Sequence, residues 1–349
     1  MLALSGSDQQ DWHARAHAKT IERFGREVFV RGVVEVSNFC RENCHYCGMR
    51  RDNRALSRYR ANLDELTELL VEHRPSSITD VNIQSGEDPV AVREIVIPLV
   101  HRLRSQTNLG ISVCAGTLTP ALYNELQNAG ARLYIMKFET ADPSLYEQLE
   151  APGTFSERVS HIRQLAANNW WVSSGFIAGL PGQSMENLLD NLRVARELPL
   201  HGCSVSPFIP GEETPLAQDP MASVDTVLNC TAALRLQQPE LVIPAVSALN
   251  IACPGEGYRR GLRAGANLCT INLTPSEVRD NYLLYKRDRF IMNEERILAA
   301  IQEEGRQVSS RSLVEFYSSN QQRTDRPFDG HQAIPGGDGS HAFGTPRLV

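Results

Sequence analysis

The sequence lacks long apolar runs, and this limits where the protein can reside. Among its 349 residues, no stretch approaches the roughly 18 consecutive apolar residues that a membrane-spanning helix needs. The first residues, Met1 to Asp8, contain neither a basic cluster nor an apolar core, so they do not resemble a secretory signal. The sequence therefore predicts a cytoplasmic protein without a membrane partner.

The sequence also lacks a strong excess of charge of either sign and a regular cysteine framework. The formal net charge is −6, and no basic segment is interleaved with aromatic residues, so we expect no nucleic-acid partner. The 8 cysteines are too few and too scattered in a chain of this length to indicate a disulfide-stabilised secreted fold. Free thiols agree with a reducing cytoplasm.

The sequence does contain a regular alternation of apolar, β-branched segments with amphipathic helical ones. The strand-like segments are 28–36, 80–84, 110–114, 132–138, 172–177, 203–208, 241–246 and 267–273. Helical patterns between them predict an α/β fold, a single parallel (β/α)8 TIM-type barrel. We expect an N-terminal helical segment over 1–25, the barrel over 26–317 and a final helix over 292–301. A Gln-, Gly- and Pro-rich composition predicts a disordered tail over 318–349.

Three closely spaced cysteines follow the first predicted strand. Cys40, Cys44 and Cys47 form a C-x3-C-x2-C pattern, and three thiolates suit a [4Fe-4S] cluster that keeps one iron open. A structural zinc ion needs four ligands, and this stretch offers only His45 as the fourth. Haem attachment needs C-x-x-C-H, whereas Gly48 follows the last cysteine. The pattern favours the open-site cluster and leaves zinc binding, thiol redox chemistry and inert cysteines as alternatives.

An aromatic residue, Tyr46, precedes the last cysteine and Gly48 follows it, so the motif resembles the signature of the radical S-adenosylmethionine (SAM) enzymes. The resemblance implies that SAM binds the open iron and that an electron from the cluster cleaves SAM to a 5′-deoxyadenosyl radical. It further implies a small substrate inside the barrel and an electron donor such as flavodoxin or ferredoxin. A protein that carries a cluster to a partner without cleaving SAM is an alternative from another class.

Residues that follow other predicted strands offer groups for each part of SAM, and active sites of such barrels lie at these strand ends. By resemblance the SAM-binding residues are Tyr46, Ser85, Gly86, Glu87, Glu139, Arg158, Gly175, Ile177 and Gly179. The segment around Gly86 suits the ammonium, and Arg158 suits the carboxylate because a guanidinium binds it with two hydrogen bonds. Plain turns, a surface ion pair and ordinary strand packing are the structural alternatives for these residues.

The motifs resemble one subgroup of these enzymes in particular. They cover 40–53, 58–60, 84–89, 139–141, 179–183, 207–210, 214–217 and 265–267. This set resembles HydE, the [FeFe]-hydrogenase maturase, and less closely the methylornithine synthase PylB and biotin synthase, over about residues 25–290. We expect a HydE-like enzyme acting on a small anionic, amino-acid-like or organometallic substrate, with a methylornithine synthase-like or biotin synthase-like enzyme as the alternative.

Two departures from the HydE pattern affect this interpretation. No cysteine follows Cys269, so we expect no second cluster. Lys137 stands where the family favours arginine, which keeps the charge and loses the bidentate fork. We therefore predict that Lys137 is a catalytic residue that pairs with a substrate carboxylate. The arginines over 50–60 indicate either recognition of an anionic ligand or donor, or a solvated loop paired with nearby acids.

Overall fold

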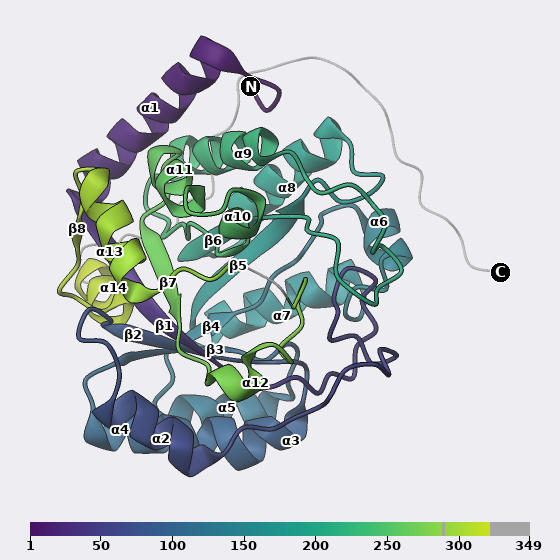
Figure 1. Ribbon diagram of the computed structural model, residues 1–349, viewed down its shortest axis with the longest axis vertical. Helices are drawn as coiled ribbons and strands as arrows, with labels where there is room; N and C mark the ends of the chain where they lie inside the picture. The colour runs from purple at the N-terminus through teal and green to yellow at the C-terminus, as the bar shows by residue number, and fades with distance from the viewer. Residues whose placement is uncertain (288–289, 322–349) are drawn as a thin grey trace, which may run out of the picture.

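The computed structural model describes residues 1–287 and 290–321, and in this part of the chain strands form a curled parallel sheet surrounded by helices (Figure 1). The strands are β1 (Glu27–Ser37), β2 (Asp80–Ser85), β3 (Gly110–Cys114), β4 (Leu133–Ile135), β5 (Trp171–Ala178), β6 (Gly202–Pro207), β7 (Leu268–Asn272) and β8 (Gln307–Val308). They are ordered β6-β5-β4-β3-β2-β1-β7, and β8 pairs with the start of β1. This order is that of the predicted (β/α)8 barrel.

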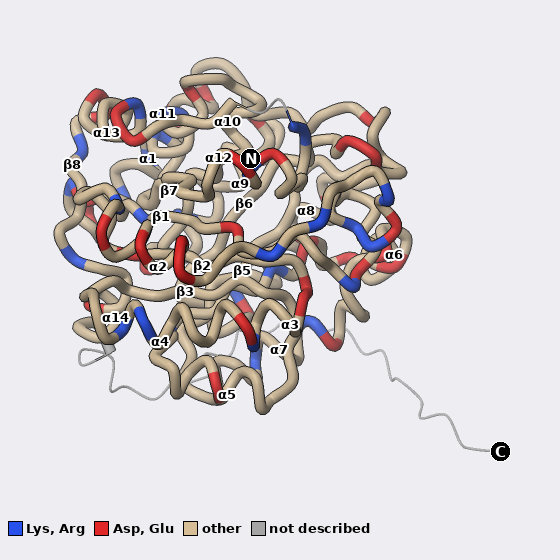
Figure 2. Tube along the Cα trace, turned by 60° about the horizontal axis from the view of Figure 1, so that its bottom comes forward, with Lys and Arg blue, Asp and Glu red and all other residues tan. Residues whose placement is uncertain are grey.

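Helices cover the outer face of the sheet and the N-terminal end of the barrel. They are α1 (Gly6–Phe24), α2 (Leu63–Glu72), α3 (Pro89–Ala91), a π-helical turn η1 (Val92–Val96), α4 (Ile97–Gln106), α5 (Pro120–Ala129), α6 (Pro143–Gln148), α7 (Phe155–Ala167), α8 (Met185–Glu197), α9 (Val224–Gln237), α10 (Ala248–Ala252), α11 (Gly257–Arg263), α12 (Ser276–Arg279), α13 (Glu294–Glu303) and α14 (Leu313–Gln321). Among these helices, none is both long and apolar enough to cross a membrane. Basic and acidic positions are interspersed along the chain in the view of Figure 2.

The segment over 241–246 is not the regular strand that its apolar pattern predicts. It joins the two edges of the sheet through isolated parallel bridges, Gly202 to Val242 and Pro244 to Leu268. The amide of Cys203 donates to Val242 O at 3.1 Å. Pro244 has no N–H to continue a ladder, so the barrel closes here through bridges alone.

Helix α14 closes the N-terminal end of the barrel. Its first amide, on Leu313, donates to the carboxylate of Asp80 at 2.9 Å, and Tyr317 packs against Trp171 with ring centroids 5.6 Å apart. The helix runs to Gln321, so the predicted tail boundary at 318 falls inside it; the remainder of that predicted tail lies outside the described residues. The interior of the barrel is therefore sealed at this end.

Candidate active site

A pocket of about 190 Å³ lies at the C-terminal ends of the strands and brings most of the predicted site residues together. Its lining includes Cys40, Cys44, Tyr46, Cys47, Ser85, Gly86, Glu87, Lys137, Glu139, Arg158 and Ile177. Two predicted residues, Gly175 and Gly179, are not part of this lining. A Cβ on Gly175 would lie 2.1 Å from Ser204 Oγ, and one on Gly179 would lie 2.5 Å from Ala222 Cβ. These glycines allow close packing around β5.

One arginine holds the loop that carries the cysteines. The guanidinium of Arg58 donates to four backbone carbonyls, those of Asn38 (2.6 Å), Met49 (2.9 Å), Arg50 (2.7 Å) and Asn53 (3.2 Å). These carbonyls lie on both sides of the cysteine motif, so the side chain fixes where the loop begins and where it ends. Arg60 instead pairs with Asp88, at 2.7 Å. For this residue, the expected pairing of the basic segment with nearby acids is confirmed.

The three cysteines are free thiols, of which Cys44 is buried and Cys40 and Cys47 are half-buried. Burial raises the pKa of Cys47 to about 12 and the pKa of Cys44 well above its ordinary value. Thiols in such surroundings become thiolates when a metal supplies the compensating positive charge, so the donor set fits an iron–sulfur cluster chemically. The amide of Glu87 donates to Cys40 Sγ at 3.4 Å. Within the described residues, no group of three or more His, Cys, Asp or Glu side chains is arranged around a single metal ion.

Glu87 connects the cysteine loop to the barrel. Its buried carboxylate accepts from Arg41 at 3.1 Å and from Arg158 at 3.3 Å. The carboxylate fits because Gly116 lies beneath it with φ +70°, where a Cβ would be 1.9 Å from Glu87 Cγ. Arg158 also donates to Thr117 Oγ1 at 3.0 Å. The guanidinium predicted to bind the SAM carboxylate thus already has an acidic partner, a pairing that the sequence did not reveal.

Glu139 has an unusual backbone and an unsatisfied carboxylate. Its φ is +59°, in the left-handed region, and its amide shares the Gly175 carbonyl with the amide of Phe138. β4 therefore ends in an irregular pairing with β5 and is shorter than the predicted 132–138. The Oε2 atom of Glu139 is buried and has no hydrogen-bond partner among the described residues. A buried acceptor of this kind is costly unless a ligand supplies a donor.

Lys137 lies two residues before Glu139 and lines the same pocket. Burial lowers the pKa of Lys137, but the negative charge of Glu139 and other neighbours outweighs burial, so the pKa is raised overall. The ammonium remains charged, and it forms no ion pair within the part of the chain that the structure describes. Such a cation can bind an acidic group of a ligand.

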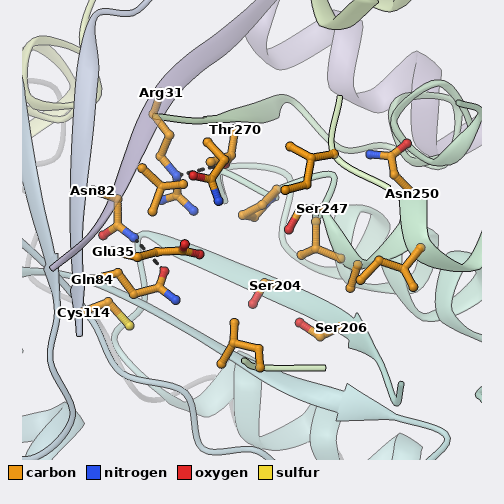
Figure 3. Close-up of a pocket in the computed structure, with 18 of the residues that line it drawn as sticks. Arg31, Glu35, Asn82, Gln84, Cys114, Ser204, Ser206, Ser247, Asn250 and Thr270 are labelled. Carbon is orange, nitrogen blue, oxygen red and sulfur yellow. Dashed lines mark hydrogen bonds between the residues drawn. The ribbon is translucent and has the colours of Figure 1, made fainter. Parts of the chain in front are cut away.

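A second cavity, of about 180 Å³, continues into the barrel and shares Gln84, Cys114 and Lys137 with the first (Figure 3). Its lining includes Arg31, which the sequence analysis did not single out. The available signal was the alternation along β1, where Arg31, Val33 and Glu35 share the inward face.

The parallel barrel and its cysteine loop agree with comparisons to known proteins. The Radical SAM superfamily model matches residues 34–212. The crystal structure of methylornithine synthase (PylB) has the same fold, with a TM-score of 0.80 and 24% identity over 91% of this chain and 94% of that chain. The chain therefore belongs to the radical SAM superfamily and is an enzyme of this class, which implies a [4Fe-4S] cluster, SAM and a reductant.

Within this superfamily the chain is similar to two characterised enzymes. The [FeFe] hydrogenase maturase subunit HydE of Thermotoga maritima is 34% identical over 264 residues, 75% of this chain and 74% of that protein. The 3-methylornithine synthase of Methanosarcina acetivorans is 27% identical over 267 residues, 76% of this chain and 75% of that protein.

Proposed function

We propose that Cys40, Cys44 and Cys47 hold one [4Fe-4S] cluster and that the pocket beside them binds SAM. The observation that carries this proposal is the meeting of three free thiols, an unsatisfied carboxylate and an unpaired ammonium in one pocket. When bound, the cluster and SAM would supply the chemistry of a 5′-deoxyadenosyl radical, and the cavity deeper in the barrel would hold the small substrate.

The chain's own residues bind SAM and exclude water. Glu87 and Asp88 are both engaged by arginines, so Glu139 is the acid whose Oε2 can accept from a donor group of SAM. Arg158 reaches the SAM carboxylate if it exchanges its Glu87 partner for the ligand. Phe208, Ile209 and Tyr282 add apolar and aromatic surface to the pocket. A dry lining matters because a primary carbon radical attacks the nearest C–H bond.

The substrate is a small anionic molecule whose acidic group binds Lys137. Support comes from the unpaired ammonium that lines both cavities and from the 34% identity to the HydE maturase, so we propose a HydE-like enzyme. An electron donor such as flavodoxin or ferredoxin would supply the reductant. No second cluster enters this proposal.

Anaerobic reconstitution tests the cluster and the cleavage step. Wild-type protein should take up iron with iron–sulfur absorbance and form 5′-deoxyadenosine with dithionite, whereas Cys44→Ala should lose both. Cys230→Ala is the matched control because Cys230 is also buried but lies on α9, away from the pocket. Tight zinc uptake without iron–sulfur absorbance would refute the proposal in favour of a zinc module. A cluster that never cleaves SAM would favour a carrier protein.

A second experiment tests Lys137. Candidate substrates with deuterium at their C–H bonds should transfer the label to 5′-deoxyadenosine in wild-type enzyme. Lys137→Ala should abolish that transfer, and Lys137→Arg should retain part of it because the charge is kept. Full label transfer by Lys137→Ala would exclude the proposed role.

A further inference from the structure

The inner cavity contains a buried cation, the guanidinium of Arg31. Arg31 projects from β1 into this cavity, and its Nε donates to Thr270 Oγ1 at 3.2 Å (Figure 3). Within residues 1–287 and 290–321 it forms no ion pair. The acid closest to it along the strands is Asp80, whose carboxylate instead accepts from the amide of Leu313 and from Thr79 Oγ1. Burial lowers the pKa of Arg31, and the charges of Cys114 and Asp80 act in the opposite direction without cancelling this effect.

Arg31 and Lys137 both line the inner cavity. Glu35 is the other charged residue among the described lining of this cavity, so cations outnumber carboxylates. The thiol of Cys114, at the end of β3, lines the same cavity. Burial raises the pKa of Cys114, the charges of Lys137 and Arg31 lower it, and the charge of Glu139 acts in the same direction as burial. An anion in this space therefore meets the positive potential of both residues.

The neutral lining of the cavity is mixed, with polar side chains among a larger apolar surface. Ser204, Ser206, Ser247 and Asn250 are among the polar lining residues labelled in Figure 3. Asn250 is 2% exposed, and its Oδ1 has no hydrogen-bond partner among the described residues. The cavity volume of about 180 Å³ is below the range of about 300–1,000 Å³ typical of drug-sized ligands. The volume suits a small ligand, and the polar side chains can bind the polar groups of an acid.

We propose that the substrate carries two anionic groups, one bound by Arg31 near the sealed end of the barrel and one bound by Lys137 near the SAM pocket. Arg31 is then a specificity-determining residue, because a guanidinium fixes the orientation of an acidic group through two hydrogen bonds. This inference rests on the proposed function and adds the charge pattern of its substrate.

Binding of simple acids to the reconstituted, SAM-loaded enzyme tests the inference. The probes are the dicarboxylates from malonate to adipate and the monocarboxylates of the same chain length, measured by calorimetry under anaerobic conditions. At least one dicarboxylate should bind about 10-fold or more tightly than its monocarboxylate, since a charge-assisted hydrogen bond is worth about one to two decades in affinity. If no dicarboxylate shows this preference, the inference is overturned.

Variants at Arg31 assign the preference to that residue. Arg31→Gln should weaken the best dicarboxylate about 10- to 100-fold, and Arg31→Lys should weaken it less. Arg311→Gln is the control, because Arg311 pairs with Glu27 at 2.7 Å outside the cavity. Circular dichroism and iron content establish that each variant is folded and loaded, and Arg31→Lys serves as the test if Arg31→Gln does not fold. Unchanged dicarboxylate binding in the folded variant overturns the inference.

The wild-type enzyme separates this inference from the proposed function. If wild-type protein forms no 5′-deoxyadenosine with dithionite, the proposed function fails, regardless of how the dicarboxylates and monocarboxylates bind. If it cleaves SAM but binds dicarboxylates no better than monocarboxylates, only the inference about the substrate fails.

Discussion

Replacing Arg58 with alanine removes the side chain that holds both ends of the cysteine loop. Four carbonyls lose a charged donor, those of Asn38, Met49, Arg50 and Asn53. Hydrogen bonds to charged groups contribute about 1.5–3 kcal/mol each, but carbonyls at this half-buried position regain water, so we expect a total loss of about 2–4 kcal/mol. For a barrel of this size, that loss lowers the midpoint of thermal unfolding by about 3–6 °C.

The effect of Arg58→Ala on the cluster should exceed its effect on the fold. The loop must present three sulfur atoms in one arrangement, and conformational freedom in the loop reduces the fraction of molecules that do so. After anaerobic reconstitution, we therefore expect iron content and iron–sulfur absorbance well below the wild-type values. Arg58→Lys should be intermediate, since a single ammonium cannot span four carbonyls.

Arg54 provides the matched control for this experiment. It lies in the same loop, is exposed and forms no hydrogen bond or ion pair with the described residues. Arg54→Ala should retain the wild-type unfolding midpoint and iron content. Wild-type values for Arg58→Ala in both measurements would refute the idea that this guanidinium organises the loop.

Three further predictions concern other parts of the structure. Gly116→Ala should displace Glu87. Gly182→Ala is the comparison, because its φ is +79° and nothing lies within 4 Å of an added Cβ, so it should cost only about 1 kcal/mol of backbone strain. Denaturant unfolding and SAM binding are measured for both variants. Burial raises the pKa of Asp80 from 3.8 to about 6, so between these pH values the native state holds the proton more tightly than the unfolded state and stability falls as pH rises. The stability difference between wild type and Asp80→Asn should change by about 3 kcal/mol across that window in urea titrations, and a pH-independent difference would contradict the assignment. Glu139→Gln should weaken SAM binding in equilibrium dialysis, because one acceptor oxygen and the negative charge are lost, and unchanged affinity would exclude its role.

Strand order and the position of the pocket could be predicted from the sequence, because apolar, β-branched segments are local signals and the active sites of such barrels lie at the strand ends. The irregular parts could not. Pro244 interrupts a segment whose composition is otherwise that of a strand, and the left-handed backbone of Glu139 depends on its pairing with β5. The partners of ionic side chains could not be predicted either. Arg158 pairs with Glu87, and the two residues are 71 positions apart in sequence. Arg31 was overlooked because one charged residue in a buried strand has no short motif around it.

The irregular closure of the ring has a consequence for how such a scaffold can diversify. Pro244, Val246 and Ser247 contribute to the wall of the inner cavity, and within the described residues this stretch contributes nothing to the wall of the cofactor pocket. Isolated bridges rather than a continuous ladder join it to the sheet, so an exchange or insertion there interrupts no regular strand. Substitutions in this stretch can therefore change the shape of the inner cavity while the cysteine loop after β1 keeps its geometry.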